Sequence, residues 1–210
     1  MQCSIVWLAI VFEGGIVVLA WGLGWLLESP PFERVHLRWQ SVAWGVVATF
    51  PPLLGMLWCT RSQWGPFPRL VREVEEKLGP WFADCSHVDF AVISMLAGLG
   101  EEALFRGVIQ TTLADSVDPW VALLVASTLF GLGHCITPTY AVLTGLLGLY
   151  LGGISMNYEN LLVAIVVHTL YDFVALVYLV RKLSAQQDSG LIRQELASGL
   201  AGKEKEDEDS

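Results

Sequence analysis

Between residues 101 and 172, six ionisable side chains lie inside or at the end of strongly apolar stretches. They are two glutamates, two histidines, an arginine and an aspartate: Glu101, Glu102, Arg106, His134, His168 and Asp172. A charged side chain at the centre of a membrane costs at least ~2.5–3.5 kcal/mol, so such residues persist where they face a protein interior and have a function. Carboxylates and imidazoles are also the usual general acids and bases, so this set predicts proton-transfer chemistry.

The spacing of these residues separates their roles. Glu102 and Arg106 are four residues apart, so on a helix they share a face and can form an ion pair. Glu101 is turned by about 100° from Glu102, which directs it elsewhere, toward the centre of a helical bundle. His168 and Asp172 are also four residues apart, so the carboxylate can fix the tautomer of the imidazole.

Glu101 and His134 form the candidate water-activating pair. A carboxylate and an imidazole that meet around a buried water act as a general base, one taking the proton while the other orients or returns it. His168 and Asp172, from a further helix, are then placed to stabilise an oxyanion by hydrogen bonding. This arrangement predicts hydrolysis of a peptide bond by activated water, without a covalent nucleophile.

The composition predicts the elements that must position these groups. The 210 residues are 54% hydrophobic and 16% charged, with a mean hydropathy of +0.54. A soluble protein carries about 25% charged residues, so the expected class is an all-α, polytopic membrane protein. The net charge of −9 excludes nucleic acid as the expected main partner, because phosphate binding needs a basic surface.

Six apolar stretches are long enough to cross a hydrocarbon core of ~30 Å. They are Ser4–Leu27, Val42–Cys59, Val88–Leu113, Pro119–Ile136, Tyr140–Met156 and Leu161–Val180. The links between the last four are very short, so these four helices are expected to form one antiparallel bundle, the catalytic core. Within it, the four-residue spacing of Gly148 and Gly152 predicts close helix packing.

The rest of the chain is expected to be more polar. Arg61–Ser86 mixes charged and aromatic residues, which predicts a connector with an amphipathic helix at the membrane interface. Gln186–Ser210 carries seven acidic and three basic residues, which predicts a disordered, solvated end. The expected parts are therefore two N-terminal spans with the connector (1–87), the catalytic core (88–182) and an acidic disordered tail (183–210).

The distribution of basic residues predicts the orientation. Six spans place both termini on one side, together with the connector. That side has six basic residues near the spans, against two on the other side: Arg61, Arg69, Arg72, Lys77, Arg181 and Lys182 against Arg34 and Arg38. The positive-inside rule then predicts cytoplasmic termini, in the plasma membrane, with membrane lipid and a peptide or membrane-protein substrate as partners.

Three motifs together resemble those of a known family. Glu101-Glu102-x-x-x-Arg106, Phe130-x-x-x-His134 and His168-x-x-x-Asp172 are similar to the EExxxR, FxxxH and HxxxN/D motifs of the CPBP intramembrane proteases. That family includes type II CAAX prenyl endopeptidases and the abortive-infection, bacteriocin-immunity and lysostaphin-resistance-protein-A-like proteins, and the resemblance covers Val88–Val180.

The resemblance implies a role for each motif residue. Glu101 and His134 would activate water, His168 and Asp172 would stabilise the oxyanion, and the ion pair beside them would support the site. Eukaryotic-type members have Asn at the position of Asp172. An ionised aspartate accepts hydrogen bonds but cannot donate them, so Asp172 is either protonated or limited to orienting His168.

Two other functions remain open from the sequence. A zinc protease could use the ligands Glu101, Glu102, His134 and His168, because carboxylate and imidazole groups suit zinc. However, the chain has no HExxH motif, and the two adjacent glutamates diverge in direction, which favours the metal-free mechanism. A proton-coupled carrier or a non-catalytic bacteriocin-immunity protein is the alternative from another class, because intramembrane carboxylates also mark proton relays.

Overall fold

The computed structural model describes the backbone of residues 4–208 and the side chains of residues 5–189. Within this range the regular structure is entirely helical, which confirms the all-α class. The elements are α1 (Ser4–Leu26), α2 (Trp39–Ala48), α3 (Phe50–Arg61), α4 (Phe67–Phe82), α5 (His87–Glu102), the π-helix η1 (Ala103–Gln110), α6 (Thr111–Ala114), α7 (Pro119–Gly133), α8 (Pro138–Tyr158) and α9 (Leu161–Glu208).

Several of these helices can cross a membrane. Four segments of the described chain are long and apolar enough by length and composition: Ile5–Leu26, Trp39–Arg61, Pro138–Tyr158 and Leu161–Ser189. The apolar helix α7 is shorter, and α5, η1 and α6 follow one another directly from His87 to Ala114. The chain is thus a polytopic membrane protein, and the number of six spans stays a prediction.

The second of these segments is interrupted close to its two prolines. Helix α2 ends at Ala48 and α3 begins at Phe50, with Thr49 between them. Pro51 lies in the first turn of α3, where its missing N–H leaves no helical hydrogen bond unmade. The break between α2 and α3 therefore lies directly before the turn that contains Pro51 and Pro52.

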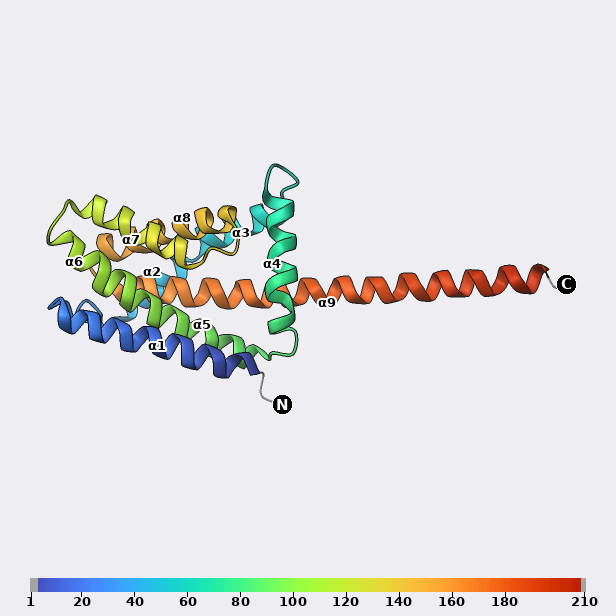
Figure 1. The fold of residues 1–210 in the computed structure, drawn as a ribbon, viewed down its shortest axis with the longest axis horizontal. Coiled ribbons are helices and arrows are strands. Elements are labelled where there is room, and N and C mark those ends of the chain that lie inside the picture. The colour runs from blue at the N-terminus through green and yellow to red at the C-terminus, as the bar shows by residue number, and fades with distance from the viewer. Residues whose placement is uncertain (1–3, 209–210) are drawn as a thin grey trace.

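Helix α9 is the centre of the bundle (Figure 1). It packs against α5, α2 and α8, while α1 lies along α5 and α7 packs on α8. At one end of the bundle, α4 runs across α9, which then continues away from the other helices. Helix α9 therefore packs directly on α5, the helix that carries Glu101 and Glu102.

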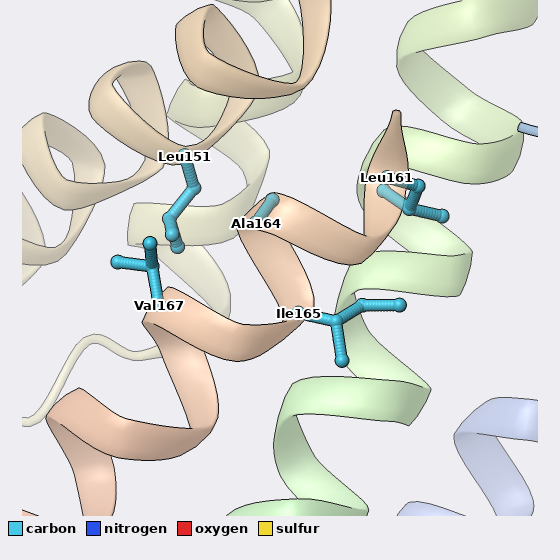
Figure 2. Close-up of a cluster of buried hydrophobic side chains, with 5 residues drawn as sticks. All are labelled: Leu151, Leu161, Ala164, Ile165 and Val167. Carbon is cyan, nitrogen blue, oxygen red and sulfur yellow. The ribbon is translucent and has the colours of Figure 1, made fainter. Parts of the chain in front are cut away.

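A cluster of buried apolar side chains sets the position of α9 (Figure 2). Leu151 of α8 points toward Ala164 and Val167 of α9, while Leu161 and Ile165 lie on the side of α5. Such packing contacts are a main source of helix association in lipid, where the hydrophobic effect is absent. Because His168 directly follows Val167, this cluster fixes the place of the histidine between α5 and α8.

A buried asparagine ties the start of α9 to the loop between α1 and α2. The Asn160 side chain donates to the His36 carbonyl (2.8 Å) and to Ser41 Oγ (2.7 Å). Its oxygen accepts from the backbone N–H groups of His36 (3.0 Å) and Leu162 (3.0 Å). The three contacts with His36 and Ser41 hold the α8–α9 turn against the N-terminal part of the chain, and the contact with Leu162 caps the start of α9.

The connector contains an amphipathic helix, α4, as expected. Glu73 on its exposed face accepts from Arg69 (2.8 Å) and Lys77 (3.2 Å), and these hydrogen bonds hold the pKa of Glu73 below its ordinary value. An ion pair of 2.5 Å between Glu75 and Lys182 fastens α4 to α9. Its location at a membrane interface stays a prediction.

The backbone after residue 182 differs from the predicted disorder. Helix α9 continues through this segment to Glu208. Residues 183–208 contain no proline and are rich in Ala, Leu, Gln, Glu and Lys, which are strong helix formers. Extending an existing helix also avoids the cost of nucleation. The division of the chain into three parts stays a prediction.

Candidate active site

The structure brings Glu101 and His134 together. Nε2 of His134 lies 3.3 Å from Oε2 of Glu101. The other ring nitrogen, Nδ1, lies 2.9 Å from the carbonyl oxygen of Phe130. A carbonyl oxygen only accepts hydrogen bonds, so Nδ1 carries a hydrogen and Nε2 is the atom whose protonation can change.

This contact needs a proton or a water molecule. Neutral Nε2 and an ionised carboxylate oxygen are both acceptors, so a proton must sit on one of them or a water must donate to both. The Glu101 side chain is 8% exposed and that of His134 is 30% exposed. The pair therefore joins a buried carboxylate to a ring that is accessible from outside.

His134 reaches α5 because α7 ends earlier than the sequence analysis expects. The apolar stretch predicts a span to Ile136, but α7 ends at Gly133 and His134 is the residue that caps it. The hydrogen bond to Phe130 turns the ring back along its own helix. Gly131, one turn earlier, allows close approach of α8, because a Cβ there would lie 2.5 Å from the Ala141 carbonyl oxygen.

Glu102 makes the predicted ion pair and a second contact that the spacing did not reveal. Its Oε1 accepts from Arg106 Nη1 at 2.9 Å and lies 2.9 Å from Nδ1 of His168. All three side chains are almost completely buried. Because the ionised carboxylate accepts, it fixes the hydrogen of His168 on Nδ1.

The free nitrogen of His168 faces the same space as that of His134. Nε2 of His168 lies 3.4 Å from Oδ2 of Asp172 and 3.9 Å from Oε2 of Glu101. Both imidazoles are thus held through Nδ1 and present Nε2 toward Glu101. The structure brings together the residues that the sequence analysis selects.

Phe130 lies between the charged groups and is itself 1% exposed. Its ring centroid is 4.6 Å from that of His134 and 5.9 Å from that of His168. The guanidinium of Arg106 lies 4.3 Å from the same centroid, within the range of a cation–π contact. Phe130 therefore fixes the planes of both imidazoles and accounts for the aromatic position of the second motif.

The segment after Glu102 is a π-helix, which the sequence analysis did not predict. Such segments are rare and often occur at functional sites. Within η1, Arg106 Nη2 donates to the Gly148 carbonyl (3.1 Å) and Gln110 Nε2 to the Gly152 carbonyl (3.5 Å). A Cβ at Gly148 would lie 3.2 Å from Arg106 Nη2. The two glycines therefore provide close packing and also expose backbone acceptors to η1.

Two further polar residues lie near this cluster. Glu13 of α1 is 7% exposed and faces Gly100, the residue before Glu101. The Tyr140 hydroxyl lies within electrostatic reach of Asp172 and Glu101. The spacing of residues within one helix could not predict that either residue lies near the site. The feature of the sequence that points to Glu13 is that it is an isolated carboxylate in an apolar stretch.

The donor geometry does not fit the alternative zinc site. In the part of the chain whose side chains are described, no three His, Cys, Asp or Glu side chains are arranged to hold one metal ion. Glu101 and Glu102 approach opposite ring nitrogens of His168, so their oxygens do not converge on a common point. Glu102 is also engaged by Arg106, which competes with any cation for the same oxygen.

Comparison with known proteins supports the resemblance seen in the motifs. Residues 85–174 match the family model described as type II CAAX prenyl endopeptidase Rce1-like. The matched range includes all six ionisable residues of the cluster, from Glu101 to Asp172. No curated protein and no solved structure matches the chain. Residues 85–174 are therefore similar to the Rce1-like type II CAAX prenyl endopeptidases, and this match supports the relation to the CPBP intramembrane proteases that the three motifs indicate.

Proposed function

We propose that the chain is an intramembrane endopeptidase of the glutamic type, which hydrolyses peptide bonds with activated water and without a metal cofactor. The observation that carries this proposal is the position of Oε2 of Glu101. It lies 3.3 Å from Nε2 of His134 and 3.9 Å from Nε2 of His168. A general base is thus flanked by two groups that can orient water and stabilise negative charge.

In the first step, Glu101 removes a proton from a water molecule held with His134. The water oxygen forms a bond to the carbonyl carbon of the peptide, and the π electrons of the carbonyl move to its oxygen. His168 acts here as the imidazolium, with Nδ1–H on Glu102 and Nε2–H donating to the oxyanion that forms. Such an interaction is usually the largest electrostatic contribution to catalysis.

In the second step, Glu101 returns the proton to the nitrogen of the leaving amine. The C–N bond breaks, its electron pair goes to nitrogen, and the products are a carboxylic acid and an amine. Asp172 contacts Nε2 of His168 at 3.4 Å. In this mechanism it accepts the Nε2–H bond before the oxyanion forms, so it orients His168 and does not need to donate.

The proposed substrates are peptides or membrane proteins presented at the membrane, including prenylated C-terminal peptides of the CAAX type. The proposal places the protein in the plasma membrane, in contact with lipid, with both termini in the cytoplasm. The partly exposed ring of His134 (30%) is the part of the pair that water can reach from outside the bundle.

The test uses the full-length protein in proteoliposomes with an internally quenched, prenylated CAAX peptide. We expect cleavage by the parent to survive exhaustive chelation. Glu101→Gln and His134→Ala should each lower the rate by about 10²–10⁴-fold, as expected for loss of a general base. The exposed Glu76→Gln serves as the matched carboxylate control and should cleave at the parent rate.

Two results would contradict the proposal. Cleavage that is lost on chelation and restored by zinc would establish the metal-dependent alternative. Cleavage at the parent rate by Glu101→Gln would exclude Glu101 as the base.

A further inference from the structure

Glu13 is a buried carboxylate in a helix whose other positions are mostly exposed or only partly buried. Helix α1 has few buried positions, and its Glu13 is only 7% exposed, on the same face as the fully buried Ala20. Isolated carboxylates at such depth are costly and mark functional sites when they face a protein interior. The burial of Glu13 therefore calls for an explanation beyond packing.

Glu13 faces the cluster around Glu101. A Cβ added to Gly100 would lie 3.3 Å from Oε2 of Glu13 and 3.2 Å from its carbonyl oxygen. The glycine before Glu101 thus lets α1 approach α5 at the site. The charged groups that act on the Glu13 carboxylate are Glu101 from α5, His134 after α7, and His168 and Asp172 from α9.

Two carboxylate oxygens at this place have no hydrogen-bond donor among the described residues when Nε2 of His134 carries no hydrogen. They are Oε2 of Glu13 and Oε2 of Glu101, and both are fully buried. When both carboxylates are ionised, each only accepts hydrogen bonds and neither can satisfy the other. A water molecule has two O–H donors, and buried waters typically satisfy polar groups that lack a protein partner.

We propose that Glu13 is a positioning residue that holds ordered water between α1 and α5, next to Glu101. This inference rests on the proposed hydrolytic function, because the water so held supplies and orients the nucleophile that Glu101 deprotonates. Glu13 lies outside the segment 85–174 that matches the family model. The first helix therefore contributes a polar group to a site whose other residues lie in the matched segment.

The test compares Glu13→Leu, Glu13→Gln and the control Ile16→Ala, which removes apolar volume on the same side of α1. We expect Glu13→Leu to lower kcat at least tenfold with KM within twofold of the parent. Glu13→Gln keeps one acceptor oxygen and should retain more activity than Glu13→Leu. The melting temperature of Glu13→Leu should equal or exceed that of the parent, because a buried carboxylate without a donor is removed. Ile16→Ala should lower the melting temperature and leave kcat unchanged.

A merely structural role would give the opposite pattern. If Glu13→Leu cleaved at the parent rate, or lost kcat only together with melting temperature, the inference would be overturned. Loss of activity in Glu101→Gln with parent activity in Glu13→Leu would reject this inference and leave the proposed function standing. Parent activity in Glu101→Gln would reject the proposed function itself.

An experimental structure of the parent at a resolution that shows ordered water gives a test independent of cleavage. We expect water within hydrogen-bond distance of Oε2 of Glu13 and Oε2 of Glu101. If no ordered water lay between α1 and α5 at this place, the inference would be overturned even if the variants had the expected cleavage rates.

Discussion

Nδ1 of His168 lies 2.9 Å from Oε1 of Glu102, the same oxygen that accepts from Arg106. The second glutamate of the pair therefore orients a histidine on α9 as well as forming an ion pair within its own helical segment. This relationship links the first and third motifs directly, across two helices. It also explains why adjacent glutamates can have separate tasks, since each faces a different nitrogen of the same imidazole.

Replacing Glu102 by Gln should destabilise the protein strongly. The change leaves Arg106, which is 3% exposed, buried without its counter-charge. Breaking such a buried pair from one side costs about 3–5 kcal/mol. Arg106→Ala should act in the same direction. Thermal unfolding in detergent measures the effect, and parent-like unfolding of both variants would refute the pairing argument.

The chain offers a matched control for that experiment. Arg69 and Glu73 are also four residues apart and form an ion pair of 2.8 Å, but the Arg69 side chain is 85% exposed. Exposed pairs contribute little, because both charges remain solvated. Arg69→Ala should therefore leave the unfolding temperature unchanged.

Glu101 and His134 should behave as one unit in a double-variant cycle. Each single variant removes the same water-activating step, so the double variant should be no more than a few-fold slower than the slower single one. Cleavage rates of the four proteins measure this coupling. Losses that multiply in the double variant would show that the two residues act in separate steps.

Gly152→Ala should destabilise the bundle, whereas Gly153→Ala should not. A Cβ at Gly152 would lie 2.4 Å from Leu123 Cδ1 and 2.5 Å from Gln110 Oε1, while nothing lies within 4 Å of one at Gly153. Overpacking costs about 1–3 kcal/mol, and alanine is favoured over glycine in a helix by about 1 kcal/mol. Unfolding temperatures that change equally would contradict the close packing of α7, α8 and η1.

Asn160→Ala should lower stability without changing the chemistry. It removes four hydrogen bonds to His36, Ser41 and Leu162, and leaving such buried groups without partners costs about 1–3 kcal/mol. The cleavage rate per folded molecule should stay at the parent value, because the Asn160 side chain does not contact the site residues. A tenfold lower cleavage rate in fully folded protein would show instead that the hydrogen bonds of Asn160 help to position His168.

Much of the fold and the cluster could be predicted from the sequence, for physical reasons. Four-residue spacings place Glu102 beside Arg106 and His168 beside Asp172, because a helix fixes such neighbours locally. The apolar stretches likewise identify the helices. The roles assigned to the site residues stay predictions until cleavage is measured.

Other features depend on tertiary geometry that spacing does not determine. The reach of His134 to Glu101 depends on α7 ending at Gly133 and on the Nδ1 contact with Phe130. The apolar stretch itself runs on to Ile136, so hydropathy alone does not predict this helix end. The π-helix η1 and the approach of Glu13 similarly arise from packing between segments that are distant in the sequence.

The continuity of α9 has a mechanical consequence. The same unbroken helix holds the apolar cluster at Leu161, both site residues His168 and Asp172, and the ion pair of Lys182 with α4. An α-helix resists twisting because its backbone hydrogen bonds link each turn to the next. The contact with α4 and the position of the His168 imidazole are therefore set by one and the same helix axis.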